Sequence, residues 1–187
     1  MFSAATALLC TAGLLTACSS GPDTAAAPPP ATASPAPTTT SAAASPTIDP
    51  AADAKSQVLA AYTGMWAEQV KAFAKGSTDG TDLERFTTDK ALGDVRISVV
   101  KFGGLGIVFT GAPAHTPQVE TIDIAATPRT ATVRDCLDVT AWKPVDKASG
   151  QEKKVTNRLR YVIVYSARTV GTDWKMTDVT RHQDQAC

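Results

Sequence analysis

Few residues of this sequence could carry out chemistry, and Asp135 is the first to consider. In "ATVRDCLDV" it is separated by an even number of residues from Val133, Leu137 and Val139. In a strand these residues would share one apolar face with Asp135. A carboxylate on a core-facing position is costly unless it is paired or hydrogen-bonded. We therefore expect either an arginine partner or a bulge that turns Asp135 outward. Asp138, on the opposite face, is expected to pair with a basic neighbour at the surface.

Two histidines are the other candidate general bases. His115 lies in the proline-rich "GAPAHTPQ" and His182 lies near the C-terminus, and both positions predict exposed side chains. The sequence contains no HExxH, CxxC, GxSxG or phosphate-binding loop. "GGLG" at 103–106 predicts a turn, because it lacks the third glycine and the preceding strand of a dinucleotide site. We therefore predict no cofactor and no metal, and we favour a non-enzymatic protein over an enzyme.

Three helices are expected to position these residues from the N-terminal side. The first covers 50–76, with an aspartate N-cap, a proline at its first position and a glycine at its end. Its apolar residues recur at helical spacing. They are Val58, Leu59, Tyr62, Met65, Trp66, Val70 and Phe73. A short helix should place Leu83 and Phe86 inward, and a third helix should cover about 89–102, despite the β character of "VRISVVKF".

The sequence then changes to short runs that favour strands. These are "GIVFTG", "QVETIDIA", "TATVRDCLDVT", "NRLRYVIVYSARTV" and "WKMTDVT", separated by Gly, Pro and Asp. Strands that follow helices as a block predict an α+β fold with an antiparallel sheet. In the fourth run Tyr161, Ile163 and Tyr165 share one face and Val162 and Val164 share the other, which predicts a central strand.

Residues 50–187, here called the head, resemble the NTF2-like superfamily, and more narrowly the small secreted NTF2-like lipoproteins of actinobacteria. The resemblance rests on the order of the elements, on "DCLDVTAW" at 135–142, on Trp174 and on the terminal cysteine. It implies a cone-shaped, curved antiparallel sheet that wraps the long helix and leaves a pocket. Enzymes of this class use a carboxylate of raised pKa for proton transfer, which makes Asp135 the candidate proton carrier. Other members of the superfamily only bind or assemble.

Aromatic side chains from the helix and the sheet would meet in such a pocket. The candidates are Tyr62, Trp66, Tyr161 and Tyr165, together with Asp135. Core packing is the alternative for each of the aromatic residues.

The first residues, "MFSAATALLCTAGLLTAC", predict an export signal over 1–17. The apolar run is shorter than the ~20 residues that cross a bilayer, and it suits a cleaved leader. Leu15–Cys18 resembles the lipobox of bacterial lipoproteins, which implies diacylation of Cys18 and cleavage just before it. No Lys or Arg precedes the run, unlike most secretory signals. The alternative is an ordinary leader with an incidental cysteine. Two acyl chains give stable anchoring, so we expect a protein on the extracytoplasmic face of the cell membrane.

Behind Cys18, residues 18–49 consist mainly of Ala, Pro, Ser and Thr, and we predict a disordered tether. The head then retains two cysteines, Cys136 and Cys187. An even number of cysteines in an exported chain predicts a disulfide, with two free thiols as the alternative. "KASGQEKKVTNRLR" predicts a charged turn leading into a strand, either a solvated edge or a contact for anionic wall polymer or lipid.

The head carries eighteen Lys and Arg against sixteen Asp and Glu, because Asp23 and Asp49 precede it. This balance gives no reason to expect nucleic acid as a partner. We expect a lipid-anchored protein whose head binds a small apolar ligand or docks onto an envelope complex, with a homodimer through the sheet face as a further option. One alternative is an isomerase or lyase that uses Asp135, and another is a structural spacer without a ligand.

Overall fold

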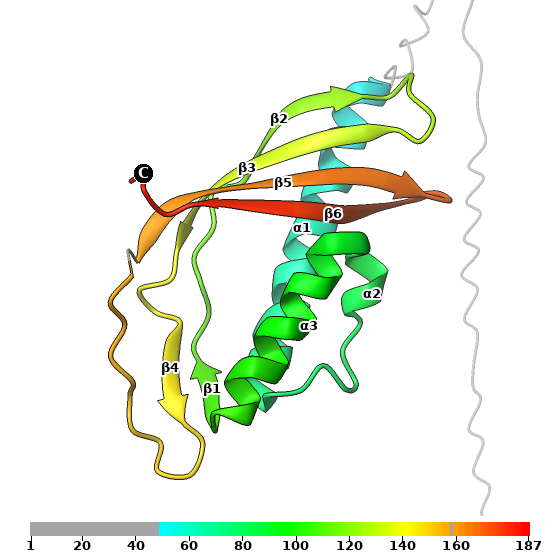
Figure 1. The fold of residues 1–187 in the computed structure, drawn as a ribbon. Coiled ribbons are helices and arrows are strands. Elements are labelled where there is room, and N and C mark those ends of the chain that lie inside the picture. The colour runs from blue at the N-terminus through cyan, green and yellow to red at the C-terminus, as the bar shows by residue number, and fades with distance from the viewer. Residues whose placement is uncertain (1–48, 158) are drawn as a thin grey trace, which may run out of the picture. The chain divides into compact units, whose positions relative to one another are not determined.

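The computed structural model of the chain describes residues 49–157 and 159–187. The predicted signal, the lipidation site at Cys18 and the tether up to residue 48 lie outside the described residues. The described part has the α+β fold that the sequence predicts, with N-terminal helices packed against a curved antiparallel sheet (Figure 1).

Helix α1 (Pro50–Lys75) is fixed at both ends by local chemistry. The Asp49 side chain accepts a hydrogen bond from the Ala51 amide at 3.0 Å, which satisfies one of the free N–H groups of the first turn. At the other end Gly76 adopts φ +72° and its N–H donates to the Ala72 carbonyl, an arrangement that favours glycine. The apolar stripe predicted for this helix is buried at Val58, Tyr62, Met65, Trp66 and Phe73. Within the described residues no helix has both the length and the apolar character needed to cross a membrane.

Helices α2 (Leu83–Phe86) and α3 (Asp89–Gly104) follow as predicted. Phe86 packs so closely on Gly64 of α1 that a Cβ there would lie 2.6 Å from the phenyl ring. Two of the β-branched residues of α3, Val95 and Val99, are four residues apart and therefore share one buried face of the helix. The buried residues of α3 are Ala91, Val95 and Val99.

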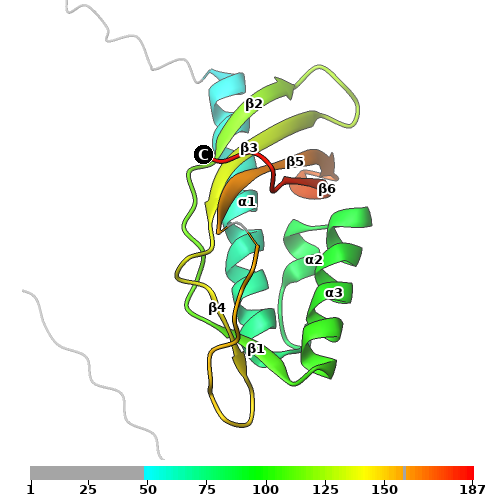
Figure 2. The same cartoon turned by 60° about the vertical axis from the view of Figure 1, so that its left-hand side comes forward.

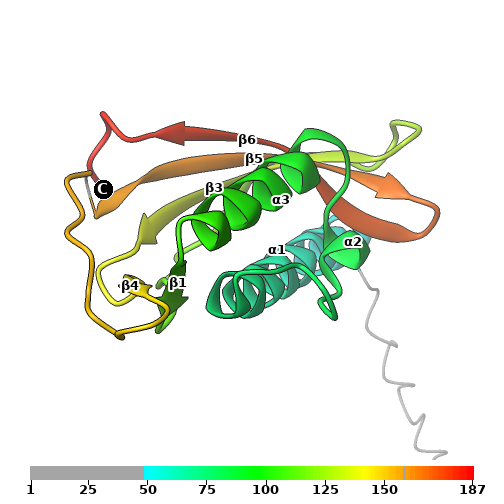
Figure 3. The same cartoon turned by 60° about the horizontal axis from the view of Figure 1, so that its bottom comes forward.

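The main sheet has four antiparallel strands in the order β2 (Gln118–Asp123), β3 (Thr130–Asp138), β5 (Arg160–Val170) and β6 (Asp173–His182). The predicted central strand, β5, lies between β3 and β6. Helices α1 and α3 lie side by side along one face of this sheet (Figures 2 and 3).

A second sheet pairs β1 (Ile107–Thr110) with β4 (Lys143–Asp146). Strand β4 was not predicted, because it has only four residues and contains Pro144, which weakens the strand signal. Pro144 is tolerated because β4 pairs with a single partner strand, leaving it at the edge of the sheet.

The core has two parts. The larger one lies between α1 and the main sheet and includes Tyr62, Val133, Leu137, Ile163 and Tyr165. The smaller one lies at the other end of α1. It consists of Ala72, Phe73, Leu83, Val95 and Val99. The half-buried Trp142 packs against both.

The predicted Cys136–Cys187 disulfide is present, with Cα atoms 5.7 Å apart. It ties the C-terminal residue to β3, and the Val162 amide of β5 donates to the Gln185 carbonyl of the same C-terminal segment. The end of the chain is therefore held against the main sheet.

Replacing both cysteines by serine should lower the stability of the head substantially. The bridge closes a loop with a sequence separation of 51 residues, and the chain-entropy model gives about 4 kcal/mol for a loop of that size. Urea unfolding of Cys136→Ser/Cys187→Ser and of the oxidised wild type measures the difference. An unchanged urea midpoint would contradict a stabilising role for the bridge.

Candidate functional site

Asp135 is the centre of a buried hydrogen-bond network. Its side chain is fully buried. Oδ2 accepts a hydrogen bond from the Tyr62 hydroxyl at 2.6 Å and lies 2.9 Å from His115 Nδ1. Oδ1 accepts a hydrogen bond from the Thr116 amide at 2.6 Å. Because an ionised carboxylate can only accept, Nδ1 of His115 carries the proton of this hydrogen bond.

Three separate segments bring these groups together. Strand β3 turns Asp135 toward the core by its alternation, and α1 presents Tyr62 from its buried stripe. The connection between β1 and β2 runs beside β3, because Ala114 and Asp138 exchange backbone hydrogen bonds of 2.8 and 3.0 Å. That pairing carries His115 over the core instead of into solvent.

The network sets the ionisation of its two acidic members. Burial alone would raise the pKa of Asp135, but the hydrogen bonds from His115, Tyr62 and the Thr116 amide together hold this pKa below its ordinary value. Burial raises the pKa of Tyr62 far above its usual range, and the neighbouring Asp135 charge raises it further. At neutral pH the network therefore consists of a carboxylate and a neutral phenol.

Two expectations for this region were wrong. Asp135 has neither an arginine partner nor an outward-turning bulge, since a phenol, an imidazole and an amide stabilise it. His115 is not solvated, since its side chain is 22% exposed and its ring lies 4.8 Å from that of Trp66. His182, also predicted to be exposed, is half-buried at the end of β6, where it pairs with Val162 of β5.

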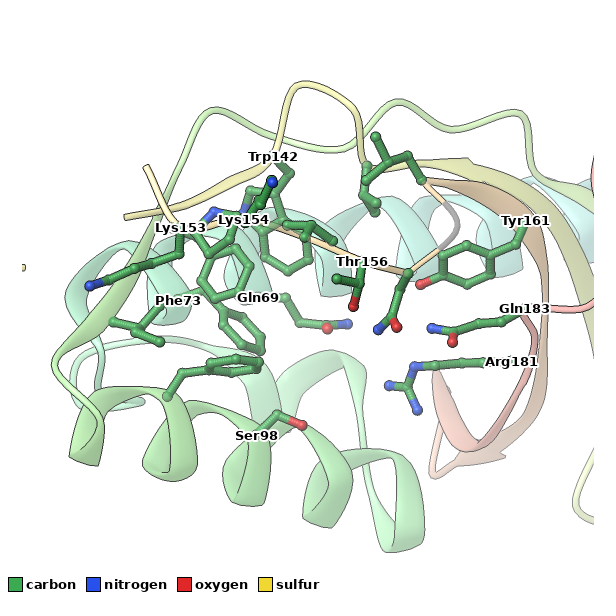
Figure 4. A pocket seen from close by; sticks show the side chains of 18 of the residues that line it. Gln69, Phe73, Ser98, Trp142, Lys153, Lys154, Thr156, Tyr161, Arg181 and Gln183 are labelled. Carbon is green, nitrogen blue, oxygen red and sulfur yellow. The ribbon is translucent and has the colours of Figure 1, made fainter. Parts of the chain in front are cut away.

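A cavity of about 410 Å³ lies beside this network (Figure 4). It is bounded by α1, α3, the β1–β4 sheet, Tyr161 of β5 and the end of β6. Residues 153–157 and Leu159 complete its lining. It occupies the place where the main sheet ends and the small sheet begins. A volume of this size falls within the roughly 300–1,000 Å³ of small-molecule sites.

One end of the cavity is aromatic. Its apolar wall consists of Trp66, Phe73, Phe102, Ile107, Phe109 and Trp142. Neighbouring rings in this wall meet edge-on or tilted, with centroids 4.8 Å apart for Phe109 and Trp142 and 6.0 Å apart for Trp66 and Trp142. Such geometry is favourable for aromatic pairs. Trp66 also contacts His115, so its indole lies between the network and the cavity.

Polar side chains converge at the other end. Gln69, Thr156, Tyr161, Arg181 and Gln183 point toward a shared space in Figure 4. Gln69 is 3% exposed, yet its Nε2 has no hydrogen-bond partner.

Two indole N–H groups of the cavity lining, those of Trp66 and Trp142, are also buried without a hydrogen-bond partner. Together with Gln69, they give the residues of the lining three buried nitrogen donors without an acceptor in the described part of the chain.

The Tyr165 hydroxyl lies behind the cavity. Burial raises the pKa of Tyr165 to about 12, and the nearby Gln69 amide opposes this rise. The two groups are nevertheless not placed as a hydrogen-bonded pair, because both the hydroxyl and Gln69 Nε2 lack a partner of adequate geometry. Gln69 Nε2 is therefore an unpaired buried donor in a residue that lines the cavity.

The predicted pocket residues divide into two groups. Trp66 and Tyr161 line the cavity, whereas Tyr62, Asp135 and Tyr165 lie in the core behind it. Sequence reasoning missed the other lining residues, including Gln69 and Arg181, and their types alone gave no signal. In the described part of the chain no group of His, Cys, Asp or Glu could hold a metal ion.

No family model and no curated protein matches the chain. Among solved structures, it is similar to the intermembrane space region of the chloroplast protein ARC6, at 15% identity and a TM-score of 0.42, over 76% of this chain and 100% of that one. Likeness at this level carries no argument about function. What the molecule itself defines is an α+β domain with an amphipathic cavity.

Asp135→Asn should destabilise the head by about 3 kcal/mol at pH 7. The substitution removes the charge, and its new NH₂ group would face the N–H and O–H donors that now bond to the carboxylate. The folded-state pKa of Asp135 is depressed, so its contribution is present above the unfolded pKa of ~3.9 and is lost as pH falls through the lower folded value. Urea unfolding of both proteins between pH 7 and pH 3 should therefore show the difference shrinking at acid pH.

The matched control is Asp173→Asn, which alters an exposed carboxylate at the start of β6. It should leave the stability within about 0.5 kcal/mol of the wild type. Equal stability of Asp135→Asn and wild type at pH 7 would show that the network does not hold the fold together.

Proposed function

We propose that this chain is a lipid-anchored extracytoplasmic protein whose head binds a small ligand non-enzymatically. The observation that carries the proposal is the cavity of about 410 Å³ with an aromatic wall and buried donors that lack partners. Apolar walls with a few convergent polar groups are typical of ligand sites.

The geometry favours binding over catalysis by Asp135. Both of its oxygens are occupied by donors of the protein, its pKa is lowered, and it does not line the cavity. A general acid or base needs hydrogen-bond reach to its substrate and a pKa near the working pH. The isomerase or lyase alternative therefore has less support than the binding module.

The N-terminal resemblance to a lipobox supports the location. A head behind the predicted tether of 18–49 would remain near the membrane without touching it. The order of helices followed by a curved antiparallel sheet is compatible with an NTF2-like cone, and we keep that family as a proposal. An envelope protein partner and a homodimer through the sheet face stay predictions.

Residues 45–187 contain the whole head, with both hydrophobic clusters and the disulfide, so this fragment can be studied as an independent folding unit. We expect it to bind the neutral fluorophore N-phenyl-1-naphthylamine, with a rise in emission. Ser98→Phe should weaken this binding at least about tenfold, because Ser98 faces the cavity from α3 and a phenyl group there would occupy it.

The control is the adjacent Ile97→Phe, since Ile97 is 68% exposed and does not line the cavity. It should bind the fluorophore as the wild type does. Native mass spectrometry of the same proteins should show the added mass of a bound small molecule in the wild type and in Ile97→Phe, but not in Ser98→Phe. This added mass should be lost when the proteins are denatured. Fluorophore binding that is unaffected by Ser98→Phe would place the ligand elsewhere.

The anchor is tested with the full chain expressed in a bacterium that processes lipoproteins. We expect the wild type to partition into the detergent phase of Triton X-114 and Cys18→Ser to partition into the aqueous phase, because two acyl chains are lost. Cys10→Ser, within the predicted signal, is the matched control and should behave as the wild type. A Cys18→Ser protein that stays in the detergent phase would rule out lipidation at this residue.

A further inference from the structure

We propose that the ligand is a single-chain amphiphile with an anionic oxygen headgroup, its tail against the aromatic wall and its headgroup at the Arg181 end. This inference rests on the proposed ligand-binding function and adds the chemical class of the ligand. It follows from the distribution of charge, donors and apolar surface within the one cavity.

The charge of the cavity lining has one sign. Among the described residues that line it, Lys153, Lys154 and Arg181 are cationic and no Asp or Glu is present. A cavity bounded by one sign of charge and by low-dielectric walls concentrates ions of the opposite sign. An anionic ligand is therefore favoured over a neutral or cationic one of the same shape.

The cations differ in how strongly the protein already pairs them. Lys153 Nζ lies 2.9 Å from Asp146 Oδ2, so its charge is largely satisfied. Arg181 has its closest carboxylate, that of Asp94, at 3.9 Å, and its side chain is 40% exposed. Lys154 has no ion-pair partner within the described part of the chain. Arg181 is the cation that faces the same space as Gln69 in Figure 4, and its fork of donors suits carboxylate and phosphate oxygens.

The buried donor of Gln69 points to the same class of ligand. Its amide faces the same space as the Arg181 guanidinium in Figure 4. An unpartnered buried N–H group costs free energy that only an acceptor can recover. A purely hydrocarbon ligand would leave Gln69 unpaired, whereas a headgroup oxygen would accept from both side chains.

The aromatic end of the cavity indicates that the other part of the ligand is an apolar tail. Phe73, Phe102 and Phe109 form a continuous apolar wall. In Figure 4 Phe73 lies at the opposite end of the cavity from Arg181, on the same side as Lys153 and Lys154. A small hydrophilic anion would leave this wall in contact with water and would gain nothing from it. An apolar chain carrying a terminal anion satisfies both ends of the cavity.

The test is displacement of N-phenyl-1-naphthylamine from residues 45–187 by four ligands with the same dodecyl tail. These are dodecanoate, dodecyl phosphate, dodecanol and dodecyltrimethylammonium, each used below its micelle concentration. We expect at least one of the anions to displace the fluorophore at a concentration about tenfold or more below that of dodecanol. Dodecyltrimethylammonium should be weaker than dodecanol. The better of the two anions identifies the headgroup as carboxylate or phosphate.

Arg181→Gln should remove most of the advantage of the anions and leave displacement by dodecanol unchanged. Gln69→Leu, which keeps the side-chain volume and removes the donor, should weaken the anions several-fold. Arg134→Gln is the charge control, because Arg134 lies on β3 outside the cavity lining, and it should behave as the wild type. If Gln69→Leu fails to fold, the exposed Arg181 position still decides the result.

The outcomes separate this inference from the function on which it rests. If all four ligands displace the fluorophore at the same concentration, the anionic headgroup is overturned. The same holds if Arg181→Gln still prefers the anions as strongly as the wild type does. In both cases the ligand-binding function of the head stands. A wild-type head that binds neither the fluorophore nor any dodecyl ligand overturns both proposals.

Discussion

A single buried carboxylate determines how the parts of this domain fit together. Asp135 accepts hydrogen bonds that originate from α1 and from the connection before β2, while its own strand belongs to the main sheet. Burying a charge without such partners would cost several kcal/mol, on the order of the whole stability of a domain. The network therefore fixes the rotation of α1 against β3, because only one helical register places the Tyr62 hydroxyl within reach.

That register also builds the cavity. Trp66 lies four residues after Tyr62, and Gln69 and Phe73 follow after seven and eleven, so all four share one face of α1. The first of them closes the buried network and the other three line the cavity. Trp66 separates the two regions with its indole, against His115 on one side and Trp142 on the other. The carboxylate thus acts on ligand binding only through the position of the helix, as a positioning group.

The sequence allowed most of the elements to be predicted, because their signals are local. The N-cap, the glycine end and the apolar period define α1, and the two apolar faces of β5 mark it as a central strand. The partners of Asp135 could not be predicted, since Tyr62 is 73 residues away and the His115 connection carries no regular pattern. The cavity could not be predicted for the same reason, because segments far apart in the sequence form it. In the sequence Gln69 is an ordinary polar residue of a helix, and only the fold shows that its amide is buried and unpaired.

The segment between β4 and β5 illustrates why the charged turn predicted from "KASGQEKKVTNRLR" has more than a solvated role. Its first part is held by the β4 edge, where Lys153 N donates to the Pro144 carbonyl at 2.8 Å. Beyond that point, residues 154–157 have no helix or strand structure, are exposed, and line the cavity. Exposed backbone with few buried contacts opens at low free-energy cost. Lys154 therefore belongs to the segment that can open most easily, whereas Arg181, to which we assign the headgroup, is held in β6. Access to the cavity and recognition of the headgroup thus depend on different elements of the fold.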